Sequence, residues 1–190
     1  MTVDNNDIVS LKINNIEVDR QKYPYLAEYA NPIKPFTGTL VGKQSAIDSL
    51  LATYDDPIVS NAVLLAPPGT GKTTLMKGMA HLDTKRVYIE AELSEMIKGL
   101  RDNAEMGYVV KNLFEEIANF GNDNKLEIVV FVDEFHQLVD YSPIVAEAFK
   151  PILAESGSKG LRLIVATTYE EFRQKIIPNQ ALTERLQRVS

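Results

Sequence analysis

The sequence predicts an α/β domain built on a parallel sheet, and two observations carry this prediction. Short apolar runs of strand length recur along the chain, and segments with apolar residues at helical spacing alternate with them. The chain also has 190 residues, of which 45% are hydrophobic and 24% charged, enough for one domain with a sizeable core. Strands that are apolar on both faces and separated by helices are typical of a parallel sheet covered on both sides.

Residues 1–39 are expected to form an N-terminal tail and linker. Within Met1–Lys22, the stretch LKINNIEVD could form a small hairpin around its two asparagines, but we favour a loose tail. Tyr23–Thr39 contains three prolines and a glycine, which indicate a helix fragment followed by an extended linker.

Residues 40–190 are expected to form the domain itself, with helices and strands in alternation. A first helix is indicated by apolar residues at helical spacing, namely Ile47, Leu50, Leu51 and Tyr54. Strands are expected at Asn61–Ala66, Val87–Ile89, Ile128–Val132 and Leu161–Thr167. Further helices are expected at Gly71–Leu82, Tyr108–Phe120 and Ser142–Glu155. Pro151 is expected to kink the last of these.

Composition excludes several classes of protein. The chain has no cysteine, so disulfides, thiolate metal sites and cysteine nucleophiles are ruled out. The formal net charge of −6 argues against non-specific binding of nucleic acid, which needs clustered Lys and Arg. There is no apolar stretch long enough to span a bilayer, and the polar, acidic start MTVDNNDIVS is unlike a secretory signal. We therefore expect a cytoplasmic protein with no membrane or nucleic-acid partner.

The stretch LLAPPGTGKTTL contains a phosphate-binding loop. Residues 66–73 (APPGTGKT) follow a predicted strand and open a predicted helix, the context that this motif requires. Glycines let successive backbone N–H groups point at an anion, and the helix adds its positive dipole end. Lys72 is expected to reach the β- and γ-phosphates of ATP, and the Thr73 hydroxyl to bind Mg²⁺.

A pair of acids follows the strand at Ile128–Val132. Asp133 lies at the tip of that strand, at the carboxyl edge of the sheet, where it is well placed to hold Mg²⁺. Glu134 is predicted to orient and deprotonate the attacking water. The alternative is that these acids cap the following helix. His136 comes next, and we interpret it as a structural or supporting residue rather than a metal ligand or proton shuttle.

Two further residues are candidates for contacts with the transferred phosphate. Thr168 follows the strand at Leu161–Thr167 and could contact the γ-phosphate or the attacking water, although capping of the next helix explains it equally well. Arg185 is predicted to lie on a short helix, from which it could stabilise transition-state charge in a neighbouring subunit. In isolation it would be taken for a surface ion-pairing residue.

Four blocks of sequence span residues 40–189: LVGKQSAIDSLL, LLAPPGTGKTTL, IVVFVDEFHQL and IVATTYEEFRQKIIPNQALTERLQRV. In this order and spacing they resemble the AAA+ ATPases, and more closely the first nucleotide-binding domain of the Clp unfoldases and disaggregases. The long fourth block favours the Clp group, because general AAA+ proteins are less similar to it. The resemblance implies a three-layer fold with sheet order 5-1-4-3-2, whose last strand is truncated here.

The resemblance also implies roles for individual residues. Asp133 and Glu134 would be the metal-associated acid and the catalytic base, Thr168 the first sensor and Arg185 an arginine finger across a ring interface. The residues that would bind the nucleotide are Val41 and Gly42, near the adenine, together with Pro68, Gly69, Thr70, Gly71, Lys72, Thr73 and Thr74.

Three features depart from the Clp pattern. The stretch KGLRDNAEMGYVV (Lys98–Val110) lacks the tyrosine-containing pore loop that grips substrate, and Tyr108 is expected on the helix that follows. Glu184-Arg185 stands where the family often has two arginines. The sequence stops at Ser190, before the complete last strand and the helical lid, so we expect a piece of a larger protein.

The expected function is ATP binding and Mg²⁺-dependent hydrolysis, weak in the isolated chain and coupled in the full protein to remodelling of protein substrates by a hexameric ring. One alternative is a nucleotide-dependent adaptor or switch that threads no substrate, which the altered pore loop favours. Another is a nucleic-acid motor, which the acidic charge disfavours.

Overall fold

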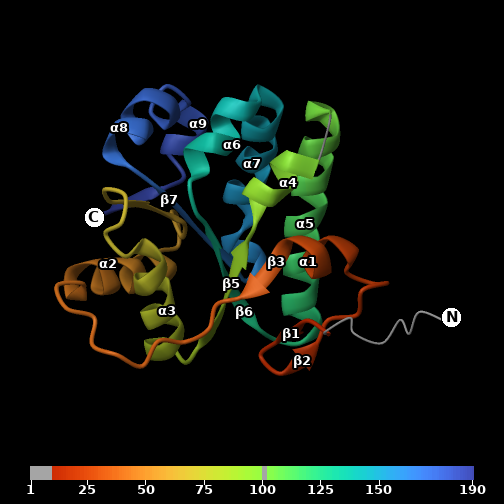
Figure 1. Cartoon of the computed structure of the whole chain (residues 1–190), viewed down its shortest axis with the longest axis horizontal. Helices are drawn as coiled ribbons and strands as arrows, with labels where there is room; N and C mark the ends of the chain where they lie inside the picture. Colours follow the sequence, from red (N-terminus) through yellow and green to blue (C-terminus); the bar gives the residue numbers. More distant parts are fainter. Residues whose placement is uncertain (1–9, 100–101) are drawn as a thin grey trace, which may run out of the picture.

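A six-stranded sheet forms the middle layer of the computed structural model, which describes residues 10–99 and 102–190 (Figure 1). Its order is β3 (Ala30–Pro32), β5 (Arg86–Ala91), β6 (Glu127–Val132), β7 (Leu161–Thr167), β4 (Ala62–Leu65) and β8 (Gln187–Val189). The five strands from β5 to β8 pair in parallel, whereas β3 is antiparallel to β5. Numbered as in the prediction, the parallel strands have the order 5-1-4-3-2. This order is confirmed, but the sheet is mixed because of β3.

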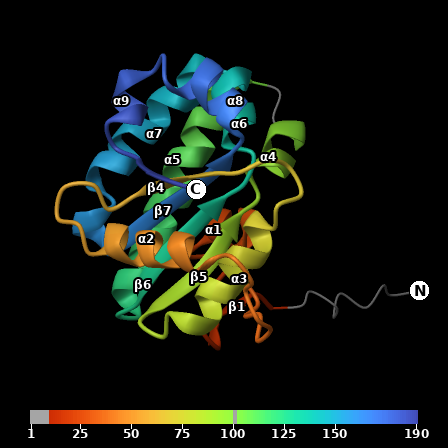
Figure 2. The ribbon, with the colours of Figure 1, turned by 90° about the vertical axis from the view of Figure 1, so that its left-hand side faces the viewer.

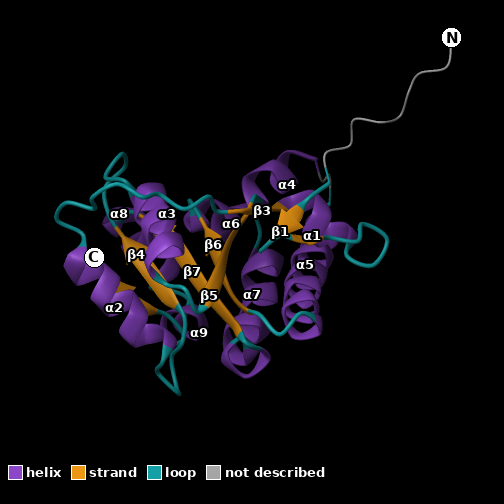
Figure 3. Ribbon diagram, turned by 90° about the horizontal axis from the view of Figure 1, so that it is seen from below, coloured by secondary structure: helices purple, strands orange, loops and turns teal. Residues whose placement is uncertain are grey.

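Helices cover both faces of the sheet. Figure 2 shows α2 (Gln44–Tyr54) and α3 (Lys72–Leu82) on one side, with α5 (Asn103–Asp123), α6 (Phe135–Tyr141) and α7 (Pro143–Glu155) on the other. The same separation of strands and helices is visible from below in Figure 3. The shorter elements are α1 (Pro24–Tyr29), α4 (Leu93–Gly99), the 3₁₀ turn η1 (Gly157–Lys159), α8 (Tyr169–Glu171), the π-helical turn η2 (Phe172–Ile176) and α9 (Gln180–Thr183).

Two cores follow from the alternation of side chains along the strands. In β4, Val63 and Leu65 pack with the larger core under α5 and α7, while Ala62 and Leu64 pack with the smaller core under α2 and α3. All four residues are buried, which explains why this strand is a continuous apolar run. The predicted helix at Ser142–Glu155 is present, and it continues through Pro151.

The N-terminal segment differs from the prediction. A hairpin forms from β1 (Lys12–Ile13) and β2 (Ile16–Glu17), and the loose tail that we favoured is wrong for residues 10–22. Asn14 and Asn15 both have positive φ, 51° and 62°, as a two-residue hairpin turn requires. Ile13 is fully buried in the larger core. The short strands gave a weak periodic signal, and burial against the rest of the molecule stabilises them.

The segment expected as helix and linker also joins the domain. The predicted helix is α1, where the Leu26 N–H donates to Glu116 of α5 at 2.8 Å. The ring of Tyr23 packs edge-on against Phe120, with centroids 5.5 Å apart. Part of the expected linker forms β3, the edge strand of the sheet. The described residues before position 40 therefore contribute to the same core as the residues after it.

Asn61 joins three elements through a buried hydrogen-bond network, and replacing it is expected to destabilise the fold. Its Nδ2 donates to the Leu153 carbonyl at 3.0 Å, and its Oδ1 accepts from Ser156 Oγ at 3.0 Å and Leu163 N–H at 2.8 Å. In Asn61→Ala these groups lose their partner, at a cost of about 2–4 kcal/mol. Urea unfolding measures the change, with the exposed Asn119→Ala as control. Equal stability of the two variants would contradict the network's importance.

Within the part of the chain that the structure describes, no helix combines the length and the apolar character that crossing a bilayer demands.

Candidate functional site

The phosphate loop connects the end of β4 to the start of α3, as predicted. Gly71 is the N-cap residue of α3 and adopts a left-handed conformation, with φ 81°. Gly69 also has positive φ, 73°. A side chain is strained at either position, so the turn that leads the backbone into the helix requires glycine. The loop thereby places the N-terminus of an eleven-residue helix at the carboxyl edge of the sheet.

Three hydrogen bonds hold this loop in shape. The Ala66 N–H donates to the Thr167 carbonyl of β7 at 3.2 Å, which ties the loop to the neighbouring strand. The Thr70 hydroxyl donates to the Pro67 carbonyl at 2.7 Å, and Lys43 Nζ donates to the Thr70 carbonyl at 2.9 Å. Lys43 was not among the predicted site residues, because nothing in its sequence spacing shows that the start of α2 lies beside the loop.

Lys72 and Glu134 face one another beside the loop. Lys72 is buried, and its Nζ lies 3.7 Å from Glu134 Oε1. A buried ammonium group is retained only with a counter-charge, which Glu134 provides. Lys72 thus occupies the position expected of a phosphate-binding cation, and Glu134 lies in the same site.

The acidic pair follows β6, as predicted. Glu134 adopts a left-handed conformation with φ 50°, which is unfavourable for a residue with a side chain. Its N–H donates to Asp133 Oδ1 at 2.9 Å. Glu134 occupies the N-cap position of α6, but its side chain makes no capping hydrogen bond. Its carboxylate faces Lys72 with one oxygen and the His136 side chain of α6 with the other, and it caps no backbone N–H of that helix.

The residues available for Mg²⁺ fit that ion. Thr73 is exposed in the first turn of α3, and the Asp133 carboxylate is half-buried at the tip of β6. Mg²⁺ usually binds one or two protein oxygen ligands and completes its shell with water and substrate phosphates. The described residues contain no group of three His, Cys, Asp or Glu side chains that would form a complete protein cage. A hydroxyl and a carboxylate suit a metal that arrives with a nucleotide.

Glu90 on β5 adds negative charge near Asp133. Burial raises the pKa of Glu90, and the neighbouring Asp133 carboxylate raises it further. Lys77 of α3 acts in the opposite direction. Glu90 was not among the predicted site residues, because it lies inside a strand and belongs to no motif. The strand ends of β5 and β6 form an acidic edge, which a cation would stabilise.

Thr168 and Thr167 have different environments at the end of β7. The Thr168 hydroxyl accepts a hydrogen bond from the Glu171 N–H at 3.2 Å and caps α8, which is the alternative raised from the sequence. Thr167 is fully buried, and its Oγ1 lies 2.9 Å from His136 Nδ1. His136 therefore has a structural partner, in agreement with its interpretation as a supporting residue. The sensor role of Thr168 stays a prediction.

A cavity of about 290 Å³ lies between the start of α2 and the phosphate loop. It is lined by Thr39, Leu40, Val41, Lys43, Gly69, Thr70, Gly71, Thr74 and Leu75. Val41 is 84% exposed, and neighbouring Gly42 has φ 70° with open space around it. Pro68 is exposed at the top of the loop. The structure thus brings Val41, expected near the adenine, together with Gly69, Thr70, Gly71 and Thr74 of the phosphate loop. Gly42, Pro68, Lys72 and Thr73 are not part of this lining.

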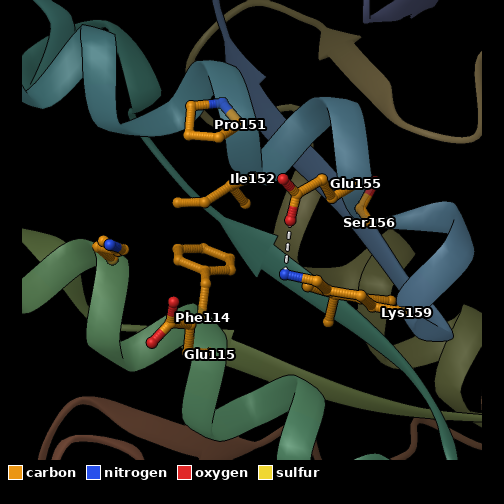
Figure 4. Close-up of a pocket in the computed structure, with 9 residues that line it drawn as sticks. Phe114, Glu115, Pro151, Ile152, Glu155, Ser156 and Lys159 are labelled. Atoms are coloured by element: carbon orange, nitrogen blue, oxygen red, sulfur yellow. Dashed lines mark ion pairs between the residues drawn. The ribbon is translucent and has the colours of Figure 1, made fainter.

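A second cavity lies at the opposite edge of the sheet. It measures about 370 Å³ between α5 and α7, with Phe114 and Ile152 facing each other across it (Figure 4). Glu155 and Lys159 form an ion pair at 2.6 Å on its rim. It reaches Leu161, the first residue of β7, and so lies away from the phosphate loop. Acids and lysines are balanced in its lining, which gives no preference for an anion.

Arg185 lies two residues after the end of α9, so the prediction that it lies on a short helix is wrong. Its Nη1 donates to the Ala181 carbonyl at 2.7 Å. Within the described residues, no carboxylate lies within ion-pairing distance of its guanidinium, so the surface ion pair is absent. Arg185 is half-buried, and its bond to Ala181 is the one hydrogen bond of its guanidinium to another described residue.

Tyr108 lies on α5, where the sequence placed it. Its side chain is 60% exposed, and its ring packs edge-on against Tyr25 of α1, with centroids 6.4 Å apart. Residues 100 and 101 of the stretch Lys98–Val110, which was expected to lack the Clp pore loop, lie outside the described residues.

The sequence of this chain matches the profile of a known protein family. The profile described as "ATPase family associated with various cellular activities (AAA)" matches residues 62–190. The chain belongs to the AAA family of ATPases. The match includes the phosphate loop, the acidic pair and Arg185, so the family supports nucleotide binding as the general property of this domain.

Within the AAA family, this chain is similar to Clp chaperones. It is 31% identical over 164 residues to the chloroplastic chaperone protein ClpC4 of Oryza sativa, covering 79% of this chain and 17% of that protein. It is 29% identical over 166 residues to the chaperone protein ClpB of Helicobacter hepaticus, covering 80% and 18%. This AAA chain therefore spans less than a fifth of the length of these relatives.

Solved structures of Hsp104 share the fold. The Saccharomyces cerevisiae Hsp104–ADP complex superposes with a TM-score of 0.70 at 24% identity, covering 87% of this chain and 30% of that one. Hsp104 with ATPγS and FITC casein gives a TM-score of 0.69 at 26% identity, covering 87% and 31%. The AAA domain described here thus shares its fold with these Hsp104 structures and is similar in sequence to the Clp chaperones.

Proposed function

We propose that this chain binds ATP with Mg²⁺ and hydrolyses it, as one nucleotide-binding module of a Clp-type remodelling protein. The observation that carries the proposal is the buried Lys72 beside a preformed phosphate loop, with Glu134 facing it at 3.7 Å. Membership of the AAA family supports the nucleotide as ligand.

The proposed reaction uses the side chains at the carboxyl edge of the sheet. The loop amides and Lys72 bind the phosphates, while Glu134 orients a water molecule and accepts its proton as that water attacks the γ-phosphate. Thr73 and Asp133 would hold Mg²⁺, which when bound neutralises charge on the phosphate oxygens. Thr168 and a neighbouring subunit's arginine complete the contacts to the transferred group.

Lys72→Ala is expected to weaken ADP binding by about 10–100-fold, because a hydrogen bond to a charged group contributes about 1.5–3 kcal/mol. Isothermal titration calorimetry with ADP and Mg²⁺ measures the change. Lys77→Ala is the matched control, since Lys77 lies exposed on the same helix. Nucleotide binding that is the same in Lys72→Ala and the wild type would contradict the proposed site.

We further propose that the whole protein couples hydrolysis to remodelling of protein substrates in a hexameric ring. Support comes from the similarity to ClpB and ClpC chaperones and to Hsp104, one structure of which contains casein. The experiment is unfolding of a tagged fluorescent protein by the full-length protein with ATP.

A nucleotide-dependent switch without threading is the second candidate, and the position of Tyr108 favours it. This tyrosine lies on α5 against Tyr25 instead of on a loop before the helix. In the same unfolding assay, a switch would bind its partner in the presence of ATP and leave the tagged protein folded.

A further inference from the structure

Two side chains contact the carboxylate of Glu134, one at each oxygen. Oε1 lies 3.7 Å from Lys72 Nζ, and Oε2 lies 3.6 Å from His136 Nε2. The Glu134 side chain is 41% exposed. A phosphate group that draws Lys72 to itself removes one of these contacts. His136 is then the neighbour that keeps the carboxylate in place.

Thr167 holds the His136 ring at the nitrogen that does not face Glu134. Its Nδ1 lies 2.9 Å from Thr167 Oγ1, and both residues are buried. The Thr167 hydroxyl carries one proton, which it can donate to Nδ1 when the histidine proton is on Nε2. In that tautomer the Nε2–H faces Glu134 as a donor. Each nitrogen of the ring then has a partner of the correct kind.

The same threonine is joined to the phosphate loop. Its carbonyl accepts the Ala66 N–H at 3.2 Å, at the point where β4 enters the loop. A continuous set of contacts therefore runs from the loop through Thr167 and His136 to Glu134. A histidine with only a packing role would need no partner beyond Thr167. The second nitrogen of His136 instead faces Glu134.

We propose that His136 is a positioning residue for Glu134: bound to Thr167 through Nδ1, it donates from Nε2 to the Glu134 carboxylate and holds it toward the attacking water. The proposal rests on the proposed ATPase function, because it assigns Glu134 the role of base. The distance of 3.6 Å is longer than a good hydrogen bond, and a small rotation of the exposed Glu134 side chain closes it.

Nuclear magnetic resonance of ¹⁵N-histidine-labelled protein tests the contact directly. The chain has two histidines, so a His81→Gln variant assigns both signals. We expect the Nε2–H tautomer for His136, and we expect Glu134→Gln to displace the His136 signals and leave those of the exposed His81 in place. An Nδ1–H tautomer, or His136 signals that do not respond to Glu134→Gln, would overturn the proposal.

Substitutions of His136 separate positioning from packing. In His136→Gln the amide nitrogen reaches near the position of Nε2, whereas in His136→Asn the amide reaches only Thr167. We expect kcat to fall by about 10²-fold in the asparagine variant with KM unchanged, and the glutamine variant to retain most of the wild-type rate. In a Glu134→Gln background, His136→Asn is expected to cause no further loss.

Binding of ADP distinguishes failure of the positioning role of His136 from failure of the proposed ATPase function. We expect all His136 variants to bind ADP as the wild type does, since Lys72 and the loop are unchanged. Equal losses of kcat and ADP affinity in both the glutamine and asparagine variants would show a packing role and refute the positioning role. Failure of the wild type to bind ADP would refute the proposed function and leave the tautomer and its contact with Glu134 as separate findings.

Discussion

Glu134→Gln is expected to slow ATP turnover by about 10²–10⁴-fold while nucleotide binding is retained, because an amide cannot accept the proton of the attacking water. The replacement keeps the size of the side chain. It also removes the negative charge 3.7 Å from Lys72 Nζ, so this ammonium is freer to bind phosphate. We therefore expect ADP affinity equal to or higher than that of the wild type. Steady-state phosphate release and calorimetry measure the two quantities.

Glu147→Gln is the control for this prediction. Glu147 is exposed on α7 and pairs with Lys150, away from the phosphate loop, so its replacement is expected to leave turnover unchanged. The prediction fails if Glu134→Gln turns over ATP at the rate of the control. A Glu134→Gln variant that loses nucleotide binding would show that the charge pair with Lys72 holds the loop together.

The strands β4, β6 and β7 of the parallel sheet could be predicted from the sequence because they are buried on both faces. The strand β6 contains the apolar run Ile128–Val132 and β7 the apolar run Leu163–Ala166. Asp133 directly follows β6, and Thr168 directly follows β7. A strand that is buried on both faces is apolar at successive positions, so it can be recognised in the sequence without knowing which strands pair with it. The order of the strands came from the resemblance to AAA+ proteins, and the structure confirms it.

The N-terminal segment could not be predicted in the same way. The strands β1 and β2 have two residues each and β3 has three, too few for a periodic pattern to stand out. The N-terminal segment as a whole is held by contacts distant in sequence, such as Tyr23 with Phe120 and Leu26 with Glu116. Proline and glycine near these strands indicated a linker, but long-range burial outweighed that local signal.

The motif residues of the candidate site could be predicted from the sequence. The residues that support them through hydrogen bonds could not. Lys72 and Glu134 belong to recognisable motifs, and the structure places them 3.7 Å apart. Thr167, by contrast, looked like the last residue of an apolar strand. Its hydroxyl reaches His136 because β6 and β7 are neighbouring strands and His136 lies shortly after β6. Such a pair requires the fold, since 31 residues separate its members.

Arg185→Ala is expected to slow ATP turnover in the proposed ring by about 10³–10⁵-fold, the contribution typical of an arginine finger. We propose that this arginine acts on a neighbouring subunit, and the strand register supports this proposal. Arg185 lies two residues before Gln187, which pairs with Ala62 at the start of β4. The phosphate loop begins after Leu65, at the other end of β4 and about 10 Å further along. The Arg185 side chain is therefore poorly placed to serve the nucleotide of its own chain.

Mixed rings of full-length protein test whether the arginine acts in trans. Rings of Arg185→Ala subunits alone and of Lys72→Ala subunits alone are both expected to be inactive. When the two are mixed, a Lys72→Ala subunit offers its intact Arg185 to a neighbour with an intact phosphate loop, so activity should return in part. Arg173→Ala, in an exposed arginine paired with Glu170, is the control that should keep full activity. An arginine acting within its own chain would give no recovery in any mixture, because every subunit would still lack one of the two groups.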